Sequence, residues 1–259
     1  MVVLPPGTLL QLMYLDERLK NIPPGRFIEV GPGSGEITKR LLKAGWSGTV
    51  YDLSAKTLDG IKQRFASEIA DDRLILILGD YLNASSAEGA RADLIISCMV
   101  MEHLDDESER KFMELSAMRL NFGGRMIGLI PSSPRHWGIE DDIAGHYRRY
   151  SRESLLSLLH ATRWSLSHVA GLTFPISNLL LPLSNLLVRR HEASKLELSS
   201  LERTKQSGRR NVRFKTHFPA YWKLLLNDRT MLLLYWIQNM FTNSNNVLVL
   251  YFEASPTLL

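Results

Sequence analysis

The stretch FIEVGPGSGEIT, residues 27–38, constrains the fold of this chain more than any other part of the sequence. A short apolar run with the character of a buried strand ends in a loop that carries Gly31, Gly33 and Gly35, and a helical pattern follows. Glycine permits tight turns that other residues rarely adopt, and the N-terminus of a helix attracts anionic groups. The stretch therefore predicts a strand, a turn and a helix that hold a nucleotide-like ligand.

The same alternation of strand and helix continues along the chain. It indicates a doubly wound α/β fold, with a parallel sheet covered by helices on both faces. Right-handed crossovers bring the loops after the first four strands to one edge, where ligands bind. The expected strands cover residues 26–30, 48–52, 73–78, 92–98, 123–130, 164–172 and 246–254, and the expected helices cover 8–20, 36–43, 54–65, 105–120 and 151–160.

The connection between the sixth and seventh strands is about 70 residues long, more than an ordinary loop requires. Residues 175–245 are therefore expected to be a helical insertion within one domain spanning 1–259, serving as a substrate lid or a dimer interface. Its apolar runs LLLPLSNLLV and MLLLYWIQNMF are too short to cross a bilayer, and we expect buried core helices there. From residue 175 onward 11 Lys and Arg oppose 5 Asp and Glu, so a membrane-surface contact is an alternative role.

The glycine loop does not fit a phosphate-containing ligand. The dinucleotide pattern needs a third glycine where this chain has Glu36, and no Lys-Ser/Thr pair follows as in a P-loop. Glu29, two residues before the first glycine, would repel a pyrophosphate. A cationic ligand without phosphate, such as S-adenosylmethionine, suits this carboxylate better.

Two further acids are expected at the same edge. Asp52 ends the second expected strand and can accept hydrogen bonds from ribose hydroxyls, while Asp80 follows the third and can accept from an adenine amino group. Leu53 and Tyr81 are candidate walls for the adenine ring. The alternative for each acid is a loop-capping role.

These motifs together resemble the class I (Rossmann-like) S-adenosylmethionine-dependent methyltransferases. The resemblance is carried by EVGPGSG, TVYDLSAKTLDG, LGDYL, DLIISCMVMEHLDD, GGRMIGLIPS and GHYRRYSRESLLSLL, within residues 26–174, and by the last strand. It implies a seven-stranded sheet of order 3-2-1-4-5-7-6 with the seventh strand antiparallel. It also implies that Glu29, the three loop glycines, Asp52, Asp80 and the backbone around Cys98 line the cofactor site. Pro32 departs from the family pattern by removing one backbone N–H donor.

The acceptor side of such an enzyme is expected after the fourth and fifth strands. His103 and His146 are candidate general bases, with local packing or hydrogen bonding as the alternative. Tyr147 and Arg149 are candidate substrate contacts, although the arginine could instead pair with Asp141 or Asp142. In the insertion, Trp222 offers an apolar wall. No metal site is expected.

The predicted activity is methyl transfer to O or N of a small-molecule acceptor such as a natural-product, sugar or lipid-like intermediate. Two alternatives remain: methylation of RNA or protein, and a cofactor-binding partner subunit without activity. The basic run lacks the interleaved aromatics of a nucleic-acid module, so no nucleic-acid partner is expected. One cysteine and no secretory pattern favour a cytoplasmic monomer or homodimer.

Overall fold

The computed structural model describes residues 3–84, 91–192, 203, 218–227 and 229–257. The chain divides into two compact units. The first, here called the sheet unit, comprises Pro23–Ile130, Arg152–Val169 and Tyr251–Leu259; the second, the helical unit, comprises Met1–Ile22, Pro131–Ser151 and Ala170–Leu250. The expectation of one domain over 1–259 stays a prediction.

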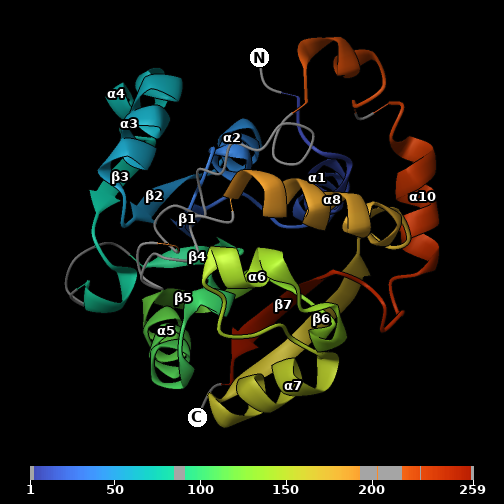
Figure 1. The fold of residues 1–259 in the computed structure, drawn as a ribbon. Coiled ribbons are helices and arrows are strands. Elements are labelled where there is room, and N and C mark those ends of the chain that lie inside the picture. The colour runs from blue at the N-terminus through green and yellow to red at the C-terminus, as the bar shows by residue number, and fades with distance from the viewer. Residues whose placement is uncertain (1–2, 85–90, 193–202, 204–217, 228, 258–259) are drawn as a thin grey trace. The chain divides into compact units, whose positions relative to one another are not determined.

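The predicted sheet is confirmed: seven strands run in the order β3-β2-β1-β4-β5-β7-β6. The pairings of β1 with β2 and β4, of β2 with β3 and of β4 with β5 are parallel. Helices lie on both sides of the sheet, α2 and α3 on one side and α5 and α7 on the other (Figure 1). The strands are β1 (Arg26–Val30), β2 (Ser47–Asp52), β3 (Leu74–Leu78), β4 (Ala92–Cys98), β5 (Leu120–Pro131), β6 (Trp164–Leu172) and β7 (Val249–Pro256).

Local sequence signals explain where the helices of the sheet unit begin. The Ser54 side chain caps α3 by accepting from Thr57 N, and Asp105 caps α5 by accepting from Ser108 N at 2.8 Å. β5 starts directly after α5, three residues earlier than predicted, because no turn separates Arg119 from Leu120. The helices are α2 (Glu36–Lys43), α3 (Ala55–Arg64), α4 (Ala66–Ala70), α5 (Asp106–Arg119) and α7 (Arg152–Ala161), with short 3-10 turns η1 (Tyr81–Asn83) and η2 (Met101–His103).

The helical unit contains the N-terminal helix and the expected insertion. Leu9 and Leu10 of α1 pack with Met231 in its core. The segment before α7 folds as two elements that the sequence did not predict, a 3-10 turn η3 and a short helix α6. Within the expected insertion, residues 193–202 and 204–217 lie outside the described residues. The unit holds α1 (Pro6–Leu19), η3 (Pro134–His136), α6 (Ile139–Ala144), α8 (Ile176–Glu192), η5 (Ala220–Leu224) and α10 (Leu232–Met240).

The two apolar runs of the insertion form helices α8 and α10, but the prediction that they are buried core helices is wrong. Most of their leucines, together with Trp236, are exposed, whereas Ser184 of α8 and Gln238 of α10 are buried. Among the described residues, no helix has the length and apolar character needed to cross a bilayer.

Candidate cofactor loop and acid–histidine network

The loop after β1 requires glycine at each predicted position. Gly31, Gly33 and Gly35 have φ values of 70°, 52° and 76°, a region that residues with a side chain rarely adopt. A Cβ atom at Gly31 would lie 2.7 Å from Cγ2 of Val100, and one at Gly35 would lie 2.6 Å from Cδ1 of Ile61. Gly35 is the N-cap of α2, so the loop directs the first N–H groups of that helix toward the strand-end edge.

Glu29 belongs to β1 and lies two residues before the first loop glycine. Its side chain is buried in β1, and Oε2 accepts a 2.6 Å hydrogen bond from Oγ1 of Thr38 in the first turn of α2. Burial raises the pKa of Glu29 to about 7, and the Thr38 hydrogen bond opposes that rise. The carboxyl therefore joins strand to helix, a role that the sequence does not indicate.

Asp52 and Asp80 both take the loop-capping role that was the alternative interpretation. Oδ1 of Asp52 accepts from Ser54 N at 2.8 Å, and Oδ1 of Asp80 accepts from Leu82 N at 2.9 Å. Both side chains are half-buried, and Leu53 beside Asp52 is exposed. Because β1, β2, β3 and β4 are parallel and in register, these residues lie at the same edge as the glycine loop. Their cofactor contacts stay predictions.

Tyr81 does not present its ring at that edge. The side chain is buried, its hydroxyl lies 3.2 Å from Oγ of Ser116, and its ring lies 5.3 Å from that of Tyr51 and 5.4 Å from that of Phe112. The Arg119 guanidinium lies 5.0 Å from the Tyr81 ring centroid. α5 supplies the ring with a cation and an aromatic partner, and the role of Tyr81 as an adenine wall stays a prediction.

The end of β4 is half-buried and locally strained. Burial raises the pKa of the Cys98 thiol to about 12, with the carboxylates of Glu102 and Glu29 adding to the rise. Met99 adopts a φ of 55°, and its N–H donates to Leu129 O at 2.8 Å. The thiol of Cys98 is therefore protonated at neutral pH, and the backbone of Cys98 keeps its predicted place in the cofactor site. His103 is partly buried in the η2 turn, and its catalytic role stays a prediction.

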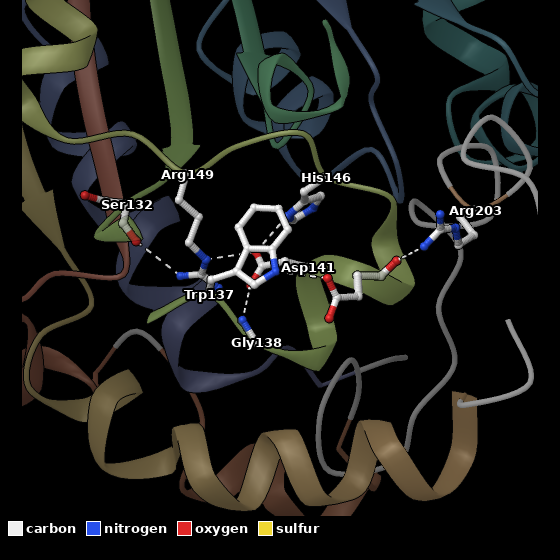
Figure 2. A network of polar contacts seen from close by, with 8 residues as sticks. Ser132, Trp137, Gly138, Asp141, His146, Arg149 and Arg203 are labelled. Atoms are coloured by element: carbon white, nitrogen blue, oxygen red, sulfur yellow. Dashed lines mark hydrogen bonds and ion pairs between the residues drawn. The ribbon is translucent and has the colours of Figure 1, made fainter. Parts of the chain in front are cut away.

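A polar network in the helical unit surrounds Asp141 (Figure 2). Its Oδ1 lies 2.8 Å from Nδ1 of His146 and accepts from Nε of Arg149 at 2.8 Å, while Oδ2 accepts from Gly138 N at 2.9 Å. Arg149 also donates to Ser132 O at 3.1 Å. Although Asp141 is fully buried, which alone would raise its pKa, the hydrogen bonds from His146 and Arg149 hold that pKa below its ordinary value.

The network assigns roles to two predicted residues. Arg149 makes the aspartate pair that was its alternative interpretation, and its contact with substrate stays a prediction. An ionised Asp141 only accepts hydrogen bonds, so the Nδ1 atom of His146 must donate, and a neutral imidazole then carries its lone pair on Nε2. A signal was present in the sequence: Asp141 stands five residues before His146 in DDIAGHYRRYS, but only the short helix α6 brings the two together.

The remaining predicted acceptor residues also lie in the helical unit. Tyr147, next to His146, is exposed. Trp222 in η5 is half-buried and packs edge-on against Phe218, with ring centroids 5.6 Å apart. Arg203 of the insertion donates to the Asp142 carbonyl (Figure 2). These placements leave the substrate roles of Tyr147 and Trp222 as predictions.

Comparison with known proteins identifies relatives of this chain. A family model described as a methyltransferase domain matches residues 9–169. A curated relative, "Probable ribosomal RNA small subunit methyltransferase A" of Methanospirillum hungatei, is 42% identical over 57 residues; the match spans 22% of this chain and 22% of that protein.

Solved structures show the same fold. The glycopeptide N-methyltransferase MtfA has a TM-score of 0.51 at 18% identity, with 63% of this chain and 82% of that chain covered. The N-methyltransferase NodS from Bradyrhizobium japonicum, solved with S-adenosyl-L-homocysteine, has a TM-score of 0.51 at 20% identity, covering 64% and 78%. The methyltransferase domain of bacterial CtHen1 has a TM-score of 0.52 at 18% identity, covering 64% and 90%.

Proposed function

Since the chain belongs to the class I S-adenosylmethionine-dependent methyltransferases, we propose that it methylates an oxygen or nitrogen atom of a small-molecule acceptor. The single observation that carries the acceptor chemistry is the contact of 2.8 Å between His146 Nδ1 and Asp141 Oδ1. A neutral hydroxyl or protonated amine must lose a proton to become a good nucleophile, so a positioned base is useful to an O- or N-methyltransferase.

The donor side of the proposal rests on the edge of the sheet unit. The positive-φ glycines allow close backbone approach, and the partly exposed Asp52 offers carboxylate oxygen to ribose hydroxyls. The proposed donor site is completed by Glu29, Gly31, Gly33, Gly35, Leu53, Asp80 and the backbone of Cys98. When bound, S-adenosylmethionine supplies a methyl group already activated by its sulfonium.

On the acceptor side, His146 takes the proton through Nε2 and Asp141 stabilises the imidazolium that forms. Arg149 holds the carboxylate of Asp141 in place and keeps it ionised. Tyr147 and Trp222 are proposed acceptor contacts, and His103 is a second candidate base.

A second candidate, an RNA acceptor, is favoured by the local match to a ribosomal RNA methyltransferase. Against it, the sequence after β4 reads SCMVMEHL and lacks the Asn/Asp-Pro-Pro-Tyr motif that stacks a base for N-methylation. Binding to RNA would weaken steeply with added salt, so a gel shift at two salt concentrations separates the two acceptor classes.

The test measures cofactor affinity and turnover in one pair of variants. His146→Ala is expected to leave the Kd for S-adenosylmethionine unchanged, by isothermal titration, and to reduce turnover of any accepted substrate about 100-fold or more. His160→Ala, an exposed histidine of α7, is the matched control and should change neither quantity. Absence of cofactor binding by the wild type would refute the donor assignment, and equal turnover by both variants would refute the base. A protein that binds the cofactor and turns over no acceptor would instead be the partner subunit.

A further inference from the structure

Helix α8 has its amphipathic character reversed. A surface helix ordinarily turns its apolar side chains toward the core. In α8, Leu179 is 75% exposed and Leu183 is 54% exposed, and Leu180 and Leu186 are exposed as well. The buried residues of this helix are Ser184, Val188 and Glu192. The leucines therefore do not stabilise the fold of the helical unit, and their exposure needs another reason.

Helix α10 repeats the reversal. Leu232, Leu233, Trp236 and Met240 are exposed, which are positions that share one helical face, while Gln238 is completely buried. The buried amide is held in place, since its Oε1 accepts from Thr173 N at 2.7 Å. The preceding turn η5 exposes Tyr221 and Leu224, and Leu225 directly after it is exposed as well. We call the exposed leucines of α8, Leu179, Leu180, Leu183 and Leu186, the apolar surface.

The exposed charges of α8 are positive. α8 ends with Arg189 and Arg190, both exposed, and the only acidic residue of α8, Glu192, is buried. Two copies meeting through a symmetric interface would bring these cations together, whereas an anionic lipid surface complements them.

We propose that the apolar surface docks on an anionic lipid bilayer, with its leucines entering the interface and Arg189 and Arg190 contacting lipid phosphates. An exposed apolar helix face followed by exposed arginines has the chemistry of a helix that lies in the membrane–water interface. The inference goes beyond methyl transfer and does not depend on which acceptor is methylated.

The test is co-sedimentation of the full chain with vesicles of phosphatidylcholine alone or mixed with phosphatidylglycerol. The wild type should bind the mixed vesicles, bind the neutral ones weakly, and dissociate as salt rises. Leu183→Glu should reduce binding to mixed vesicles about tenfold or more, and the double substitution of Arg189 and Arg190 by Ala about thirtyfold. Leu156→Glu, on the equally exposed Leu156 of α7, is the matched control and should bind as the wild type does. Circular dichroism verifies that each variant is folded.

Three results would overturn the proposal. The first is no binding to either vesicle. The second is equal binding to both vesicles without salt dependence, which would remove the role of the arginines. The third is a concentration-dependent dimer, detected by light scattering without vesicles, that Leu183→Glu dissociates and Leu156→Glu does not; a second copy of the chain would then be the occupant.

Discussion

Replacing Glu29 by glutamine should make the protein more stable at alkaline pH, although it removes a residue of the proposed donor site. Glutamine has the same shape and keeps an oxygen that accepts from Thr38 Oγ1, which now lies 2.6 Å from the carboxyl. It does not ionise. The substitution therefore isolates the effect of a buried charge.

The magnitude follows from the pKa of the carboxyl. Burial raises it from 4.5 to about 7 in the folded protein. The stability associated with the bound proton is fully present below pH 4.5 and is lost as pH rises through 7, because the folded state holds the proton more tightly than the unfolded state. A shift of about 2.5 pH units corresponds to about 3 kcal/mol. At pH 8 the free energy of unfolding of Glu29→Gln should exceed that of the wild type by about 3 kcal/mol, and the difference should shrink toward pH 4.5.

Urea denaturation followed by circular dichroism, from pH 5 to pH 8 without cofactor, measures this difference. Thr38→Val is an informative companion, because removing the hydrogen bond that lowers the Glu29 pKa should move the loss of stability to higher pH. If wild type and Glu29→Gln give parallel pH profiles, or if the variant is the less stable at pH 8, the buried-charge reasoning fails.

The same substitution should weaken cofactor binding if Glu29 serves the donor site. A cationic ligand favours the ionised carboxyl, so the affinity of the wild type for S-adenosylmethionine should rise with pH through 7. The affinity of Glu29→Gln should be lower and independent of pH over that range. Isothermal titration at pH 6 and pH 8 tests both statements, and a pH-independent wild type would show that the carboxyl does not sense the ligand.

Three further changes have defined outcomes. Gly31→Ala should lower cofactor affinity about tenfold or more, since φ is 70° and the new Cβ would lie 2.7 Å from Val100 Cγ2; unchanged affinity by titration would show that the loop tolerates a side chain. Asp141→Asn should reduce kcat about 100-fold or more and alter the pH–rate profile, because the His146 tautomer loses its partner; a smaller kcat with an unaltered profile would indicate a structural role alone. Cys98 should resist iodoacetamide at pH 8 in the folded protein and react after denaturation, as mass spectrometry can measure, because its thiol pKa is about 12.

The features that could be predicted from the sequence are those with a local physical cause. Alternating apolar patterns produce the strands and helices whatever their neighbours, and the order of those elements is enough to indicate the sheet. Gly31, Gly33 and Gly35 were identifiable because a backbone with positive φ accepts almost no other residue. Asp52 and Asp80 could be placed at strand ends because the apolar pattern of the sequence shows where each strand stops.

The features that only the tertiary structure decided depend on partners distant in sequence or on which face of an element is covered. The Tyr81 ring turns inward because α5 brings Arg119 and Phe112 against it. Arg149 binds Asp141 because a six-residue helix, too short to have a periodic signature, places that carboxylate. The leucines of α8 predict a core helix because the composition of the segment is apolar. Only packing decides whether the apolar face of a helix contacts protein or is left exposed.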